Sequence, residues 1–354
     1  MDRLKFAGKV ATGSDTLSLG WNAVIQRLRA AVRKRPAGGI AVLFVLVQLT
    51  CIAGGLIFPE QFRYLNPANI RVTVMSVAPL GIMSLGVGML MIAGEFDLSV
   101  GALYSFCAVF AATMANNHFG GINNPLSPFI GASLGVGIGI AAGLLNGAVT
   151  IGFGIPSFIT TLGTMLLWNG GVLLYNGASA VDFLPKPPFA PLFGGQFWLM
   201  DSGFLWFLGL AVVCSFVLHH HKLGNHFYAV GGNQQAAVAI GIDPAKVKLI
   251  AFAITGGLAA FSGIVAMTRV SSVQPGGGMG MELRSIAACV IGGVALMGGR
   301  GSIVGVVLGT ALVFTINDVL LLLRAPGFYF DMFVGALIML AVILNHSIRR
   351  RSWT

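Results

Sequence analysis

The feature that most constrains the fold is a series of long apolar runs with almost no charge. The first run, residues 40–58, has 19 residues and no charged side chain. About 20 helical residues cross the hydrocarbon core of a bilayer. Only 9% of the 354 residues are charged, whereas soluble proteins average about 25%. Because a backbone in lipid must satisfy its own hydrogen bonds, the chain is predicted to be an all-α polytopic membrane protein.

About ten transmembrane helices are expected, with the eighth the shortest and the one that could re-enter instead of crossing. The expected spans are 40–58, 72–93, 98–115, 129–151, 157–175, 203–218, 249–270, 285–297, 303–323 and 328–344. Ten spans put both ends on one side, and 15 of the 21 Lys and Arg residues then fall on that side. Basic residues stay in the cytoplasm, so the predicted topology is N-in and C-in.

Three regions are expected. They are a basic cytoplasmic extension at 1–39 with eight Lys and Arg, a transmembrane domain at 40–346, and a basic cytoplasmic tail at 347–354. The extension does not match a cleavable signal peptide. Its residues 21–35 suit either an amphipathic helix on anionic membrane lipid or an unstructured tail, and both interpretations stay open.

Neither a nucleic-acid partner nor a metal site is expected. The net charge is +10, but the basic residues are scattered at the ends of loops, which membrane orientation explains. The four cysteines each lie in a separate apolar run and are interpreted as small buried apolar residues. Three of the clustered histidines, His219, His220 and His221, are consecutive, which is poor spacing for metal ligands on one helix face.

Two acidic residues lie between the second and third spans, in the sequence GEFDLSVG at 94–101. Carboxylates at membrane depth are costly and usually functional. Flanking glycines allow the helix to break there, with Asp97 or Ser99 as the N-cap of the next helix. Glu95, Asp97 and Ser99 are therefore candidates for a solute pathway, and the alternative is a plain turn with capping carboxylates.

Asn146 and Asn169 are further polar candidates, because each lies inside an expected span. The alternative for both is an ordinary polar contact between helices. Glycines recur at every fourth residue from 131 to 147 and from 301 to 309. This spacing indicates close helix packing and not nucleotide binding.

The longest polar segment inside the apolar part of the chain is 223–248, and its lysines indicate the cytoplasmic side. Gly231 and Gly232 are predicted to form a turn, followed by a short helix at 234–240. Gly241 would end that helix, and Asp243 and Pro244 would lead into the next span. A short helix between two turns has a shape suited to docking, although a passive linker is the alternative.

Several catalytic signatures are absent from the sequence. It has no G-x-x-x-x-G-K-[ST], no H-E-x-x-H and no paired C-x-x-C. The chain therefore carries no nucleotide-binding P-loop of its own, and an intramembrane enzyme is unsupported. No catalytic residue and no cofactor on this chain are predicted.

Four stretches together resemble the permease subunits of bacterial ABC importers for ribose and other simple sugars, a family that includes branched-chain amino acid permeases. The stretches are GEFDLSVG, AVGGNQQAAVAIGID, ELRSIAACVIGGVALMGGRGSIVGVVLG and the basic C-terminus. The resemblance covers residues 40–351. One departure is Glu95 and Phe96, where many sugar permeases have Gly and Ile.

The resemblance implies a transport subunit for a small neutral solute in the bacterial inner membrane. Within that class of solutes, it favours a monosaccharide. Its implied partners are an ATPase subunit that binds ATP and Mg, a second permease subunit that is identical or similar, and a periplasmic binding protein. The implied contact with the ATPase is Gly231, Gly232, Asn233, Ala236, Ala237, Gly241 and Ile242. Two alternatives remain at this stage. One is an ion-coupled transporter that uses Glu95 and Asp97, and the other is a passive channel or a structural membrane protein.

Overall fold

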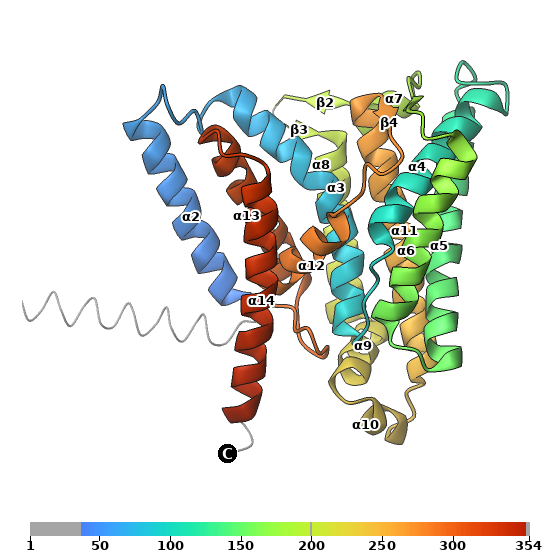
Figure 1. Cartoon of the computed structure of the whole chain (residues 1–354), viewed down its shortest axis with the longest axis vertical. Coiled ribbons are helices and arrows are strands. Elements are labelled where there is room, and N and C mark those ends of the chain that lie inside the picture. Colours follow the sequence, from blue (N-terminus) through green and yellow to red (C-terminus); the bar gives the residue numbers. More distant parts are fainter. Residues whose placement is uncertain (1–36, 199, 352–354) are drawn as a thin grey trace, which may run out of the picture.

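The described chain is a bundle of helices (Figure 1). A computed structural model describes residues 37–198 and 200–351. Residues 21–35, interpreted as either an amphipathic helix or an unstructured tail, lie outside these residues, as does most of the 1–39 extension. The long helices are α2 (Gly38–Ile57), α3 (Pro67–Ile92), α4 (Val100–Asn117), α5 (Ser127–Phe153), α6 (Ser157–Asn176), α8 (Ser202–His220), α11 (Pro244–Val270), α13 (Ile303–Leu322) and α14 (Phe328–Arg351).

Seven of the described helices are long and apolar enough to cross a membrane, namely α2, α3, α5, α6, α8, α11 and α13. The prediction of an all-α polytopic membrane protein is therefore confirmed. The last helix, α14, is longer than the expected span 328–344, because it continues into the basic tail as far as Arg351.

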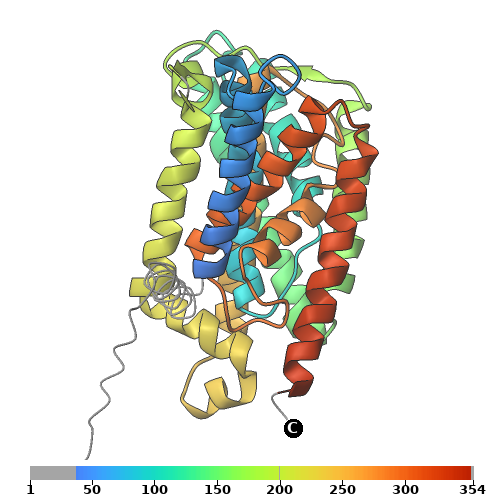
Figure 2. The ribbon, with the colours of Figure 1, turned by 90° about the vertical axis from the view of Figure 1, so that its left-hand side faces the viewer.

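Short elements mark the two ends of the bundle. At one end, called here the α10 end, lie α9 (Lys222–Gly232) and α10 (Gln234–Ala239). At the other, the α7 end, lie α7 (Phe189–Gly194) and two small sheets. Strand β1 (Val181–Asp182) pairs with β4 (Ser272–Val273), and β2 (Gln196–Phe197) pairs with β3 (Met200–Asp201), both antiparallel. Figure 2 shows α9 and α10 at the bottom, the end of the bundle at which α14 also ends.

The core is built around the second half of α3, which is buried from Val77 to Ile92. Helix α11 packs against α3, and α5 packs against α11. A side chain at Gly143 would overlap the carbonyl oxygen of Phe252 in α11, and one at Gly135 would lie 2.9 Å from the carbonyl oxygen of Cys107 in α4. The glycine repeat is thus a packing surface, as predicted. The four cysteines are all buried and free.

The expected eighth span is wrong as a continuous helix. Helix α12 (Met281–Ile291) has 11 residues and spans only about 17 Å at 1.5 Å per residue. Residues 292–302 continue without a helix to the α10 end, where the Gly299 amide donates to the carbonyl of Ile92 (2.8 Å). Gly293, Gly298 and Gly299 have φ values of +85°, +80° and +73°, and a right-handed helix cannot contain them.

Candidate functional site

The predicted short helix at 234–240 is present as α10. The Asn233 side chain accepts a hydrogen bond from the Ala236 amide (3.0 Å), and this caps the first turn. Gly241, with φ +84°, follows the helix in the left-handed conformation, as predicted. Asp243 then caps α11, because its carboxylate accepts hydrogen bonds from the backbone amides of Lys246 and Ala245. These bonds, chiefly the one from Lys246, hold the pKa of the carboxyl group below its usual value.

The predicted turn at Gly231 and Gly232 is wrong, because both residues end helix α9. The sequence analysis did not predict α9. Its start is capped by His221, whose ring nitrogen Nδ1 accepts from the Leu223 amide (3.2 Å). One member of the histidine cluster therefore has a structural role at a helix start.

The residues implied to contact an ATPase divide between two faces of α10 and its flanks. Ala236 and Gly241 are exposed, together with the apolar Val238 and Ile240, whose exposed fractions are 56% and 73%. Ala237 points the other way and is 2% exposed within the apolar core. The surface that α10 offers to a partner is therefore centred on Val238 and Ile240.

Four glycines join α9 to the rest of the bundle. We call Gly94, Gly231, Gly298 and Gly299 the glycine junction. A side chain on Gly231 would overlap the carbonyl oxygen of Ile92 and lie 2.8 Å from the Gly299 amide nitrogen. A side chain on Gly298 would lie 2.8 Å from the Gly94 Cα. The end of α3, the end of α9 and the 292–302 segment thus meet backbone to backbone.

Glu95 forms an ion pair and does not join the other acidic residue of its motif. Lys248 Nζ lies 2.7 Å from Glu95 Oε1, and the two side chains are 16% and 12% exposed. Lys248 Nζ also donates to Gln234 Oε1 (2.9 Å), in the first residue of α10. Glu95 is therefore connected to the short helix through one lysine.

Residues 94–99 form the predicted break before α4, and α6 holds their backbone in place. The Phe96 amide donates to the Ser157 hydroxyl, and the Leu98 amide donates to the Thr161 hydroxyl, both at 3.0 Å. Ser157 and Thr161 are one turn apart on α6. The sequence offered a signal for them, since two hydroxyls four residues apart follow Pro156, but that signal was missed.

Three of the predicted pathway residues form one buried cluster, which we call the Asp97 cluster. Asp97 Oδ1 accepts from the Ser99 amide (2.8 Å) and the Ser99 hydroxyl (2.6 Å). Asn146 Nδ2, from α5, donates to Asp97 Oδ2 (3.1 Å) and Ser99 Oγ (2.9 Å). Ser99 is the N-cap residue of α4, but its own side chain caps nothing; Asp97 accepts the amide instead.

The other two predicted pathway residues lie apart from this cluster. Glu95 turns to Lys248. Asn169 lies on α6, 12 residues beyond Ser157, which is about 18 Å along the helix. Among the described residues, Asn146 Oδ1 and the hydroxyls of Thr150 and Thr160 are buried without a hydrogen-bond partner. Polar atoms that could accept a polar ligand therefore lie on α5 and α6 around the Asp97 cluster.

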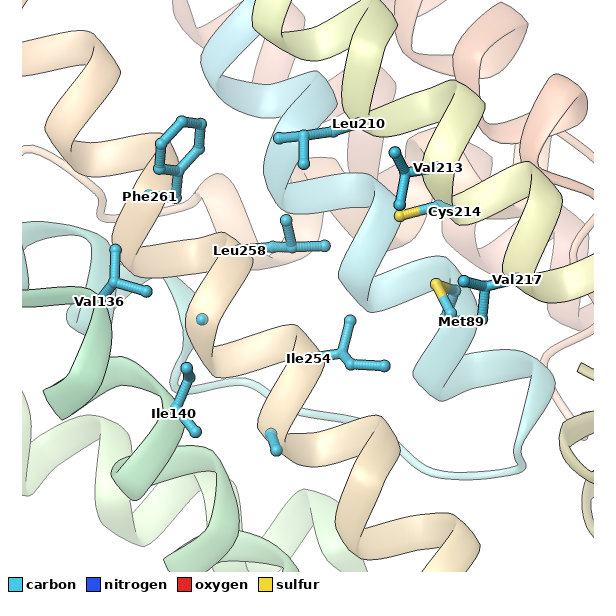
Figure 3. A pocket seen from close by; sticks show the side chains of 12 residues that line it. Met89, Val136, Ile140, Leu210, Val213, Cys214, Val217, Ile254, Leu258 and Phe261 are labelled. Atoms are coloured by element: carbon cyan, nitrogen blue, oxygen red, sulfur yellow. The ribbon is translucent and has the colours of Figure 1, made fainter. Parts of the chain in front are cut away.

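A cavity of about 430 Å³ beside α3, α5, α8 and α11 has a different character. Every side chain labelled in Figure 3, from Met89 to Phe261, is apolar. Since hydroxyl groups need hydrogen-bond partners when they are removed from water, this cavity does not fit a polar solute.

Comparison with known proteins places the chain in a family. Residues 69–342 match the family described as the branched-chain amino acid transport system / permease component. The autoinducer 2 import system permease protein LsrC of Salmonella paratyphi B is 33% identical over 305 residues, 84% of each chain. The xylose/arabinose import permease protein XylH of Sulfolobus acidocaldarius is 31% identical over 311 residues, 88% of this chain and 86% of XylH.

The match to LsrC of Photorhabdus luminescens is similar, with 32% identity over 303 residues that cover 84% of this chain and 87% of the relative. No solved structure matches the chain significantly. The family match spans the helix break at 94–99, the short helix α10 and the 292–302 segment. The chain therefore belongs to this permease family, and it is the membrane permease subunit of an ABC importer.

Proposed function

We propose that the chain forms half of the translocation pathway of an ATP-driven importer for a neutral monosaccharide-type solute in a bacterial inner membrane. The relatives named for autoinducer 2 import and for xylose/arabinose import support this solute class. The unpaired oxygens near the Asp97 cluster also support it, because a sugar carries hydroxyl groups that would satisfy them. Asp97, Ser99 and Asn146 are assigned to the pathway.

The observation that carries the proposal is α10, a capped helix at one end of the bundle (Figure 1). Its exposed Val238 and Ile240 suit a contact with another protein, since exposed apolar groups mark interaction surfaces. The partner is a separate ATPase subunit, which binds ATP and Mg. The exposed residues Gly232, Asn233, Ala236 and Gly241 form or flank the contact, while Gly231, Ala237 and Ile242 hold the helix against the bundle.

The proposed topology has ten crossings. The seven long apolar helices make seven of them. The other three are residues 94–99 with α4, α12 with residues 292–302, and α14. The α10 end faces the cytoplasm because Lys222, Lys246, Lys248 and Arg300 all lie at or near it. The chain enters α2 in the lower half of Figure 1 and leaves α14 at the bottom, which supports N-in and C-in.

Two further partners complete the importer. A second permease subunit, identical or similar, would form the other half of the pathway. A periplasmic binding protein would deliver the solute at the α7 end, which faces away from α10. The residues of that end lie in α7 and the two small sheets.

An ion-coupled transporter would need Glu95 and Asp97 to act together on a proton or a cation. Their contacts speak against this, since Glu95 is paired with Lys248 at 2.7 Å and Asp97 is bonded to Ser99 and Asn146. A passive channel would have no use for the capped helix and its connection to the helix break.

The test is uptake of labelled xylose or arabinose into proteoliposomes that contain the chain with its ATPase, with solute-loaded binding protein outside. Uptake should require ATP on the ATPase side and should survive ionophores that collapse proton and sodium gradients. Gradient-driven uptake by vesicles with the chain alone would contradict the proposal and support the ion-coupled alternative.

A further inference from the structure

The Glu95–Lys248 ion pair lies where three functional elements meet. Glu95 is the second residue of the segment that breaks the membrane helix, and Lys248 is near the start of α11. With exposed fractions of 12% and 16%, both side chains are largely removed from water. A pair in that setting is screened much less than a surface pair, so a change at one partner is felt strongly by the other.

The lysine connects this pair to α10. Lys248 Nζ holds both Glu95 Oε1 at 2.7 Å and Gln234 Oε1 at 2.9 Å. Gln234 is the first residue of α10, so any displacement of the helix start acts on the lysine. Helix α10 packs mainly on α9 and α11. A cavity of about 470 Å³ lies beside the pair, between α10, the start of α11 and the α5–α6 turn at Gly154, and it leaves room for such a displacement.

On the other side, the pair is continuous with the predicted pathway. Glu95 is followed by Phe96 and Leu98, whose amides are bonded to hydroxyls of α6. Between them lies Asp97, which is bonded to Ser99 and Asn146. A displacement of Glu95 therefore acts on a non-helical segment, in which the Phe96 and Leu98 amides are bonded to side chains of α6 and not to backbone carbonyls of a helix.

We propose that Glu95 and Lys248 are positioning residues that transmit the movement of α10 to residues 94–99 and so to the Asp97 cluster. The inference rests on the proposed function, in which an ATPase moves α10. In the resting state the ion pair holds the segment closed against the α10 end. When the ATPase shifts α10, Gln234 and Lys248 move with it, and the carboxylate of Glu95 follows or is released.

The same loop offers a matched control. Lys246 forms an ion pair with Asp243 at 3.4 Å, but its side chain is 80% exposed and that of Asp243 is 48% exposed. Lys246 lies two residues before Lys248, and this pair also joins a lysine to a carboxylate, as the Glu95–Lys248 pair does. Exposed pairs contribute little, and the ion-pair partner of Lys246 is Asp243 and not a residue of 94–99.

The experiment compares E95Q, K248Q, the exchanged pair E95K/K248E and the control K246Q in the full importer. Solute uptake and ATP hydrolysis are measured on the same proteoliposomes. The single variants E95Q and K248Q should transport at least tenfold less solute per ATP hydrolysed than the wild type. Their rate of ATP hydrolysis should stay within about twofold of the wild-type rate. The exchanged pair should recover most of the wild-type ratio of solute transported to ATP hydrolysed, and K246Q should match the wild type in this ratio.

Hydrogen exchange on the full-length chain in detergent gives a second readout that needs no ATPase. E95Q, K248Q and Q234A should all speed exchange at the Phe96 and Leu98 amides, and K246Q should not. Wild-type coupling in E95Q and K248Q would overturn the inference, as would a folded exchanged pair that stays uncoupled. Failure of the proposed function is distinct, because the wild type itself would then show no ATP-driven uptake.

Discussion

Gly231 is the residue at which α9, α3 and the 292–302 segment come closest. No side chain fits there, because its Cβ would overlap the Ile92 carbonyl oxygen. That oxygen is already the acceptor for the Gly299 amide at 2.8 Å. The neighbouring Gly232 is different, since a Cβ there would lie 3.9 Å from the nearest atom, the Gly299 Cα. The two adjacent glycines at the end of α9 therefore differ, because a side chain fits at Gly232 but not at Gly231.

This contrast makes a direct prediction. Gly231→Ala should separate α9 from α3, break the Gly299–Ile92 hydrogen bond and lower ATP-driven uptake at least tenfold. Gly232→Ala should retain most of the uptake. The comparison is made in proteoliposomes at equal amounts of folded protein, and equal uptake by the two variants would show that the junction does not need this close contact.

At the residue scale, the sequence pointed to the right neighbourhood but not to the right contacts. Asp97, Ser99 and Asn146 were predicted near the pathway, and they do form one cluster. Glu95 was grouped with them because it is two residues away, whereas its partner Lys248 is distant in sequence. No spacing rule links residues so far apart, and Lys248 was counted only as a cytoplasmic charge.

At the scale of elements, α10 depends on its cap. It has six residues, and a helix this short is unstable by itself because nucleation is costly. The Asn233 side chain satisfies one of its free amides, that of Ala236. Replacing such a cap by alanine costs about 1 kcal/mol, which is large for one and a half turns of helix.

Asn233→Ala should therefore loosen α10 without unfolding the bundle. The expected result is an increase of roughly fivefold in hydrogen exchange at the α10 amides, with α11 unchanged, since 1.4 kcal/mol corresponds to about tenfold. Asn233→Asp should exchange like the wild type, because a carboxylate also caps. Asn225→Ala, an exposed position within α9, is the control, and equal exchange in all variants would mean that packing alone holds α10.

Elements with a local signal were predictable, and those set by tertiary contacts were not. The long apolar helices and α10 follow from hydropathy and from Asn233 and Gly241. Helix α9 was missed because KLGNHFYAVGG contains three glycines, which disfavour helix, yet packing of the buried Phe227 and Val230 stabilises it. The eighth span was drawn too long because its apolar residues continue past Ile291 into glycines with positive φ.

At the scale of the whole molecule, the connections gather at one end of the bundle. The glycine junction and the Glu95–Lys248 pair both lie between α10 and the membrane helices. The Asp97 cluster follows directly along the chain. A partner that moves α10 therefore acts on the end of α3, on residues 94–99 and on residues 292–302 together.

In the proposed importer, the contact with that partner uses the exposed side of α10. The resemblance implied Ala237 as one of the residues that contact the ATPase, but its exposed fraction is 2%. A charge at this position would therefore disturb the packing of α10 itself. Ile240 is 73% exposed at the same helix. Leu184, at 66% exposed, lies in the segment between β1 and α7 and serves as a matched position at the opposite end.

The most direct test of this account is co-purification of the tagged chain from its native membrane, with the bound proteins identified and quantified. The wild type and Leu184→Arg should retain an ATPase subunit that carries a P-loop. Ile240→Arg should lose most of it, at least tenfold, while the yield of folded chain stays the same. An ATPase that stays bound to Ile240→Arg, or a wild-type chain that purifies without one, would contradict the assignment of α10 as the coupling contact.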